Sequence, residues 1–215
     1  MELQGKKVVF LGDSITQGVG ASKQENRYTD VFGRLSGAKV YNYGVSGTRV
    51  APQRDNRGER SDLDFILRAD ETEKDADAVV IFGGTNDFGH GDAPFGEIGD
   101  TTPETFCGAL RVLFEKMIER NPSARFVIMT PLHRMSEDKI INERGLPRRK
   151  LKEYAAAIRA VAEYYSLPVL DLWASSGIQP HVGVIRETLL PDGLHPSDAG
   201  HARIAEMLYN FMKTL

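Results

Sequence analysis

The chain has 215 residues and a mass of 23.8 kDa, which is typical of one globular domain, because a single core grows to about 250 residues before a chain divides. Hydrophobic residues make up 41% and charged residues 27%, a balance typical of a folded rather than a disordered protein. The formal charge of −3 gives no electrostatic reason to expect a nucleic acid or an anionic membrane as partner.

Cysteine content and apolar patterning exclude further classes. Cys107 is the sole cysteine, so the chain forms no internal disulfide, and its Cys and His residues lack the spacing of a structural zinc site. The N-terminal segment has neither the long apolar stretch nor the cleavage site of a secretory signal. No window approaches about 18 consecutive apolar residues, the length that spans a bilayer. We therefore expect a cytoplasmic protein.

Apolar runs and amphipathic segments alternate along the chain. Short runs of apolar and β-branched residues predict strands at 7–11, 40–43, 78–82, 126–130 and 168–170. Apolar side chains at three- and four-residue spacing predict helices at 104–120, 148–165 and 198–212, and weaker patterns predict helices at 28–35 and 62–73. Ser197 is the expected N-cap of the last helix. This alternation predicts a single domain over residues 1–215, a three-layer α/β/α sandwich around a five-stranded parallel sheet.

Glycine-rich or polar turns follow the predicted strands. They lie at 12–16, 44–48, 83–87 and 130–134, and a fifth polar turn at 192–196 precedes the last helix. Because ligands bind at the carboxyl ends of parallel strands, this placement indicates an enzyme. Three longer polar segments, at 51–60, 89–103 and 133–147, are expected to wall a substrate pocket.

Ser14 directly follows the first strand, where its hydroxyl can lie in the cleft beside backbone N–H groups of the next turn. A serine becomes a nucleophile when a neutral histidine, held by an acceptor on its other nitrogen, removes its proton. Of five histidines, only His195 has a carboxylate at short spacing in a constrained turn, namely Asp192, with Gly193 between them. We therefore predict Ser14 as nucleophile, His195 as base and Asp192 as the residue that orients the base.

The other histidines are weaker candidates for a catalytic role than His195, and the common nucleotide-binding and nucleophile motifs do not suggest another function. His90, His133 and His181 lie in predicted loops, where contact with a substrate and an ordinary loop role both remain open. His201 lies inside the last helix, where a surface or packing role is expected. The chain has no Gly-x-Ser-x-Gly elbow, no phosphate-binding loop and no complete dinucleotide fingerprint.

Acyl transfer also needs hydrogen-bond donors where negative charge develops, and losing one donor costs about 3 kcal/mol. The glycine-containing backbone of Gly44-Val-Ser-Gly47 can approach a substrate closely, and the side chain of Asn86 supplies an NH₂ donor. Taken alone, Asn86 is equally well explained as an ordinary turn residue.

Four segments together resemble the SGNH, or GDSL, hydrolase family. They are Gly-Asp-Ser-Ile at 12–15, Asn-Tyr-Gly-Val-Ser-Gly at 42–47, Gly-Thr-Asn-Asp at 84–87 and Asp-Gly-Leu-His at 192–195. Isoleucine stands where the family name has leucine, a conservative exchange. The segments occur in the family's order and extend over residues 12–196, so the resemblance covers essentially the whole chain.

The resemblance implies a flavodoxin-like fold and a specific oxyanion hole. The N–H groups of Ser14 and Gly47 and the amide of Asn86 would hold the oxyanion, while Asp192 and His195 would be the acid and base. No metal or organic cofactor is implied. Asp13 is expected to fix the turn rather than to transfer protons.

We expect a carboxylic ester hydrolase that acts on short acyl groups such as acetyl, carried by a small molecule such as a carbohydrate. The Gly-, Asp- and Pro-rich segment 89–103 suits a polar substrate better than a long acyl chain. Two alternatives within the family stay open, a lysophospholipase and an acyl-thioester hydrolase. In the latter, a basic group would meet coenzyme A phosphates instead of forming a solvated surface: Arg134, Arg144, Arg148, Arg149 and Lys150. A non-catalytic carbohydrate-binding protein is the alternative from another class.

Overall fold

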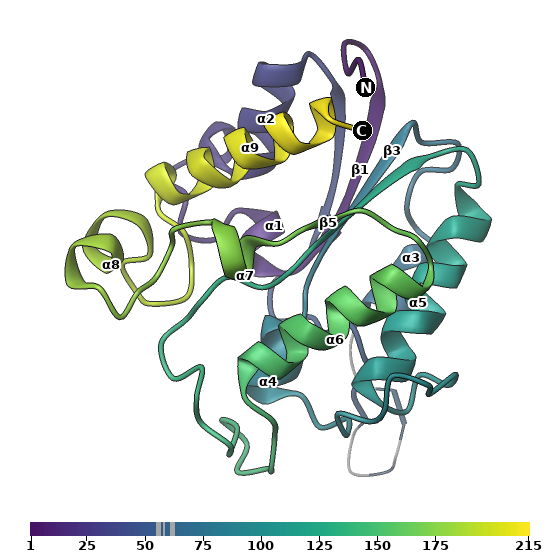
Figure 1. Cartoon of the computed structure of the whole chain (residues 1–215), viewed down its shortest axis with the longest axis vertical. Coiled ribbons are helices and arrows are strands. Elements are labelled where there is room, and N and C mark those ends of the chain that lie inside the picture. Colours follow the sequence, from purple (N-terminus) through teal and green to yellow (C-terminus); the bar gives the residue numbers. More distant parts are fainter. Residues whose placement is uncertain (55–56, 58, 61–62) are drawn as a thin grey trace.

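The computed structural model of the chain describes residues 1–54, 57, 59–60 and 63–215. Within this part of the chain, five parallel strands form one sheet in the order β2-β1-β3-β4-β5, with helices on both faces (Figure 1). The strands are β1 (Lys7–Gly12), β2 (Lys39–Gly44), β3 (Ala78–Phe82), β4 (Arg125–Met129) and β5 (Val169–Leu170). The three-layer α/β/α fold expected from the sequence is confirmed, and the strand order is the flavodoxin-like one.

Two helical layers sandwich the sheet (Figure 1). One layer contains α2 (Tyr28–Ser36) and α9 (Asp198–Lys213), and the other contains α3 (Phe65–Ala69), α5 (Phe106–Arg120) and α6 (Leu151–Tyr164). The remaining helical segments are short: α1 (Ser14–Gln17), η1 (Gln24–Asn26), α4 (Thr85–His90), α7 (Leu172–Ser175) and α8 (Gly183–Leu189). Sequence periodicity does not predict these short segments, because fewer than about two turns give no repeat to recognise.

The molecule has two apolar cores, one on each face of the sheet, and side chains of β1 pack in both. Val9 and Leu11 pack with the α3, α5 and α6 layer, whereas Val8 and Phe10 pack with α2 and α9. These side chains alternate between the two faces because a strand has a period of two, and all four are fully buried. The continuous apolar runs therefore reflect a sheet that is covered on both sides. Strand β2 departs from this pattern because it is an edge strand and is only half-buried.

Local capping interactions determine where several helices begin. Helix α9 begins after Ser197, the expected cap, whose hydroxyl accepts a hydrogen bond from the Gly200 N–H at 3.3 Å. Helix α6 begins three residues later than expected, because the backbone of Lys150 is extended and the Glu153 carboxylate accepts the Lys150 N–H. The helix expected over 62–73 is shorter, at α3, where Asp64 is the N-cap. Residue 62 lies outside the described part of the chain.

Ser14 lies at the topological switch point of the sheet. The chain leaves β1, goes outward to the edge strand β2, and returns to β3 on the other side of β1. In open α/β sheets, ligands bind outside the carboxyl ends of the strands at such a point. Helices α1 and α4 begin close after β1 and β3, so Ser14 and Asn86 both lie at this edge. None of the described helices has the length and apolar character needed to cross a bilayer.

Candidate active site

The structure brings Ser14, His195 and Asp192 into one chain of hydrogen bonds. Ser14 Oγ lies 3.0 Å from His195 Nε2, although 181 residues separate the two along the sequence. On the other side of the imidazole, His195 Nδ1 lies 2.7 Å from Asp192 Oδ2. The carboxylate accepts from Nδ1–H, which leaves Nε2 as the nitrogen that can accept the serine proton.

The turn that contains Asp192 keeps its carboxylate ionised. Asp192 Oδ1 accepts the backbone N–H groups of Leu194 at 2.8 Å and His195 at 2.7 Å. Partial burial alone would raise the pKa of Asp192, but these hydrogen bonds and the one from the His195 ring hold that pKa below its ordinary value. An ionised carboxylate fixes the ring orientation and stabilises the imidazole in its charged form.

At this edge of the sheet, two backbone N–H groups have no hydrogen-bond acceptor in the part of the chain that the structure describes. Within the described residues, the N–H groups of Ser14 and Gly47 make no hydrogen bond, whereas the N–H groups of their neighbours Ile15 and Ser46 do. Gly47 has a φ of +77°, and a Cβ there would meet nothing within 4 Å, so glycine is required by the backbone and its surroundings are open. Unpaired donors beside an open surface can stabilise a developing negative charge.

Asn86 is connected to the segment that contains Gly47. Its Nδ2 donates one hydrogen to the Thr48 carbonyl at 2.9 Å, which leaves the second hydrogen of the amide for another acceptor. The neighbouring Asp87 accepts the N–H groups of Val50 at 3.0 Å and Ala51 at 2.9 Å. The start of α4 and the loop after β2 are therefore held together by three hydrogen bonds, which fixes the two expected oxyanion donors relative to each other.

The side chain of Asp13 caps α1 beneath the nucleophile. Its Oδ1 accepts the Ile15 N–H at 3.0 Å, and the residue is 2% exposed, which agrees with the structural role expected for it. Burial raises the pKa of Asp13 to about 7, while the Ile15 hydrogen bond acts in the opposite direction.

The other histidines take different positions. His201 is fully buried, accepts the Tyr28 N–H at Nδ1 and lies 3.2 Å from the Val19 carbonyl at Nε2, so it has the packing role that was one of the two expected. Burial lowers the pKa of His201 to about 4, which keeps the ring neutral. His90 contacts Arg49, and His181 lies at the surface 4.0 Å from Glu137.

The sequence interpretation missed Arg68 and Glu137 near the site and considered Arg134 only as a possible phosphate ligand. Arg68 of α3 is buried and donates to the carbonyls of Gly12 and Tyr43, at the ends of β1 and β2. Arg134 is also buried and donates to Thr85 at the start of α4. Glu137 holds the ring of His133. Arg68 interrupts the apolar segment 65–69, and such a lone charge is the one sequence signal that could have drawn attention to it.

A narrow crevice adjoins the nucleophile. Its walls include Asp13 and Leu194, the sequence neighbours of Ser14 and His195, and it has no volume accessible to a water molecule. A larger recess of about 500 Å³ lies between segments 91–95 and 146–149. The expected pocket-forming segments 89–103 and 133–147 thus line recesses, whereas residues 55, 56 and 58 of the segment 51–60 lie outside the described part of the chain. Among the described residues, no three His, Cys, Asp or Glu side chains gather as metal ligands would.

A serine, a histidine and a carboxylate joined by hydrogen bonds at the switch point of a parallel α/β sheet form the arrangement that serine hydrolases use on several unrelated folds. Comparison with known proteins gives the family: residues 10–203 match the GDSL-like Lipase/Acylhydrolase family, and the chain belongs to it.

Relatives agree with this assignment. The chain is 27% identical over 209 residues to the human "Platelet-activating factor acetylhydrolase IB subunit alpha1", which covers 97% of this chain and 76% of the relative. A crystal structure of a Lactobacillus plantarum protein superimposes with a TM-score of 0.83 at 29% identity, covering 99% of this chain and 98% of the other. A putative GDSL-like lipase from Bacteroides ovatus has a TM-score of 0.70 at 22% identity, covering 99% and 100% of the two chains, and shows the shared fold.

Proposed function

We propose that the protein is a serine esterase that removes short acyl groups from small polar molecules, with Ser14, His195 and Asp192 as its catalytic triad. The observation that carries the proposal is the continuous hydrogen-bonded path from Ser14 Oγ to His195, at 3.0 Å, and on to Asp192, at 2.7 Å. Both distances are within the range that proton transfer requires.

The reaction follows from this geometry. Ser14 Oγ attacks the ester carbonyl carbon while His195 Nε2 takes the serine proton, and Asp192 stabilises the imidazolium that forms. The carbonyl oxygen becomes an oxyanion that receives hydrogen bonds from the N–H groups of Ser14 and Gly47 and from the Asn86 amide. The intermediate collapses, the alcohol leaves with the proton from His195, and the acyl group stays on Ser14. Water then attacks the acyl-enzyme with His195 again as base, which releases the acid and restores the serine.

The acyl group is proposed to be short because the segment 89–103 is rich in Gly, Asp and Pro, a composition that suits a polar substrate better than a long acyl chain. The name of the mammalian relatives, acetylhydrolase, supports a two-carbon acyl group.

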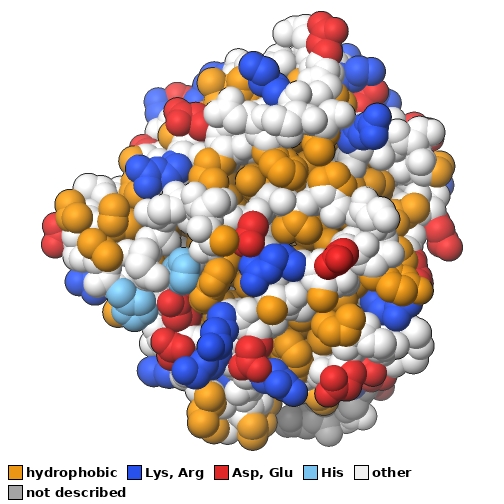
Figure 2. Space-filling model, in the orientation of Figure 1, with side chains coloured by type: hydrophobic (Ala, Val, Ile, Leu, Met, Phe, Trp, Pro, Cys, Tyr) orange, Lys and Arg blue, Asp and Glu red, His pale blue; other side chains and the backbone are white. Residues whose placement is uncertain are grey.

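The thioester alternative has less support. The basic residues that could meet coenzyme A phosphates are largely paired with acids: Arg134 with Glu143, Arg144 with Asp92, Arg149 with Glu153 and Lys150 with Asp138. On the face drawn in Figure 2, acidic and basic side chains lie next to one another near the histidines, without a patch of a single sign. A polyphosphate would therefore have to displace existing ion pairs, whereas a neutral ester would not.

Intact-protein mass spectrometry after treatment with a fluorophosphonate tests the proposal without a natural substrate. We expect one adduct on the wild type and on a Ser123→Ala control at the opposite end of the sheet, and none on Ser14→Ala. Hydrolysis of p-nitrophenyl acetate should be lost in parallel and should exceed hydrolysis of the octanoate ester. An unlabelled wild type, or a labelled Ser14→Ala variant, would contradict the assigned nucleophile.

A further inference from the structure

A second imidazole lies beside the proposed triad. His133 follows β4 at the carboxyl edge of the sheet and borders the same crevice as Asp13 and Leu194. Its segment is bonded directly to the turn that contains the proposed base, because the Met135 N–H donates to the Gly193 carbonyl at 2.8 Å. The position of His133 relative to His195 is therefore set by backbone contacts.

The His133 ring is held on two sides. Its Nδ1 lies 3.0 and 2.9 Å from the two carboxylate oxygens of Glu137, which also accepts the Arg134 N–H at 3.0 Å. One face of the ring packs on Trp173, with the ring centroids 3.8 Å apart. A side chain fixed by both a buried carboxylate and an aromatic ring has already lost the rotamer freedom that binding would otherwise remove.

The remaining nitrogen of His133 is available. Within the described residues, Nε2 of His133 makes no hydrogen bond, and it is not among the buried atoms that lack a partner, so it is open to solvent. In the tautomer that donates Nδ1–H to the Glu137 carboxylate, Nε2 carries the lone pair and is an acceptor. The group that fits this atom is a hydroxyl donor.

We infer that His133 Nε2 binds a free hydroxyl group of the substrate, and hence that the natural substrates are partly acylated polyols or sugars; this inference rests on the proposed esterase function. Ser14 and His133 follow β1 and β4, the two neighbours of β3, so both lie at the same carboxyl edge of the sheet and one substrate can reach both. One hydroxyl then contacts His133 while the ester carbonyl meets Ser14. His133 is in this view a specificity residue and takes no part in proton transfer.

The test compares two acetate esters that differ in one respect, a neighbouring free hydroxyl. Glycerol monoacetate provides it and ethyl acetate does not. In His133→Phe the ring against Trp173 is kept and Nε2 is removed, so kcat/KM for glycerol monoacetate should fall about tenfold, mainly through KM, the effect of one good hydrogen bond. Ethyl acetate hydrolysis should change less than about twofold. His133→Gln, which restores an acceptor, should recover part of the loss, and His181→Ala, which removes a neighbouring surface histidine, should change neither ester.

Equal losses for both esters, or no loss for either, would overturn the inference, while fluorophosphonate labelling of Ser14 would leave the esterase proposal intact. A binding measurement can show the His133 contact even if the esterase proposal fails. In Ser14→Ala, which cannot turn over the ester, NMR titration with glycerol monoacetate should show binding that His133→Phe weakens about tenfold. If the wild type is neither labelled nor active but this difference in binding persists, the contact stands and the esterase proposal fails. Equal binding of glycerol monoacetate by Ser14→Ala with and without His133→Phe would overturn the proposed contact.

Discussion

Two carboxyl groups near the proposed nucleophile are almost fully buried. Asp13 and Asp87 are 2% and 5% exposed, and each accepts backbone N–H groups. Burial raises the pKa of Asp13 to about 7 and that of Asp87 to about 6, despite those hydrogen bonds, and the charge of Asp87 adds to the effect on Asp13. At neutral pH this part of the molecule therefore contains carboxyl groups that are close to their titration points.

This burial makes stability depend on pH through Asp13. The folded state holds the Asp13 proton up to about pH 7, whereas the unfolded chain releases it near its ordinary value of 3.8. The stabilisation is thus fully present below pH 3.8 and is lost as pH rises through about 7, at most about 1.4 kcal/mol per pH unit. In Asp13→Asn the amide oxygen can still cap Ile15, but this dependence is absent. Urea unfolding at pH 5, 6, 7 and 8 should therefore show the wild type losing stability relative to Asp13→Asn.

His201 is unchanged in the Asp13→Asn variant, so its own titration cancels in the comparison. Parallel stability profiles for the two proteins over this range would show that Asp13 is already ionised in the folded state.

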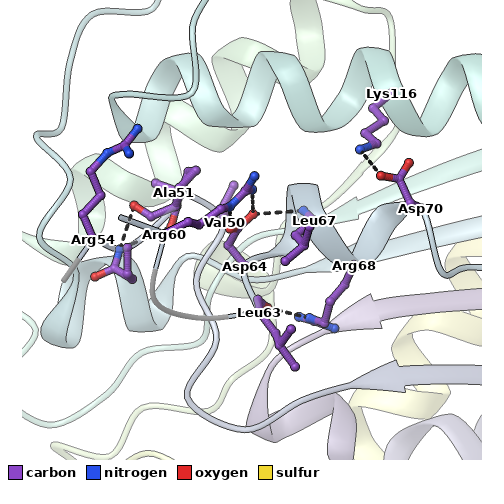
Figure 3. A network of polar contacts seen from close by, with 12 residues as sticks. Val50, Ala51, Arg54, Arg60, Leu63, Asp64, Leu67, Arg68, Asp70 and Lys116 are labelled. Atoms are coloured by element: carbon purple, nitrogen blue, oxygen red, sulfur yellow. Dashed lines mark hydrogen bonds and ion pairs between the residues drawn. The ribbon is translucent and has the colours of Figure 1, made fainter. Parts of the chain in front are cut away.

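At the scale of elements, helix α3 joins the two segments that hold the proposed nucleophile and oxyanion donors. Figure 3 shows Arg68 extending from α3, with its bond to the Leu63 carbonyl. The same guanidinium donates to Gly12 and Tyr43 carbonyls at 3.0 and 2.6 Å and to Thr48 Oγ1 at 2.8 Å. Gly12 lies two residues before Ser14, and Thr48 directly follows Gly47. A five-residue helix therefore sets the spacing of the site.

Replacing Arg68 with methionine should destabilise the protein and misplace the oxyanion donors. The methionine removes several hydrogen bonds from a buried cation, at about 1.5–3 kcal/mol each, so we expect a loss of at least about 3 kcal/mol in unfolding free energy. The rate of fluorophosphonate labelling of Ser14, measured well below the lowered melting temperature, should also fall, and Arg68→Lys should recover part of it. Arg120→Met is the control, because Arg120 donates to Thr72 away from the site. Unchanged labelling in Arg68→Met would limit Arg68 to a stabilising role.

The contrast between Asp192 and Arg68 shows which parts of the site the sequence could predict. Asp192 and His195 are three residues apart in one turn, so their pairing follows from local spacing. Arg68 acts on acceptors 20 to 56 residues away, and no local pattern encodes such contacts. The long apolar strands and helices were predictable for the same reason as the turn, because their signals repeat locally. The shorter extent of α3 depends on the Asp64 cap and its tertiary contacts.

At the scale of the whole molecule, the two apolar cores share one sheet. Leu113 of α5 belongs to one core and Leu208 of α9 to the other, and both are fully buried. Every residue of β1 between Val8 and Leu11 contributes to one core or the other, so neither layer can separate from the sheet without exposing the opposite core. We propose that the chain is one domain and unfolds as one cooperative unit.

Leucine-to-alanine replacements on opposite faces test this cooperativity. Leu113→Ala and Leu208→Ala should each cost about 2–5 kcal/mol, and their effects should add within about 0.5 kcal/mol because the two leucines belong to different cores. Trp173, the single tryptophan, packs on the core that contains Leu113. If the molecule is one unit, Leu208→Ala shifts the urea midpoint of Trp173 fluorescence as far as it shifts the midpoint of far-ultraviolet circular dichroism. A fluorescence midpoint that stays in place while the dichroism midpoint moves would mean that the two layers unfold separately, and that the sheet does not couple them.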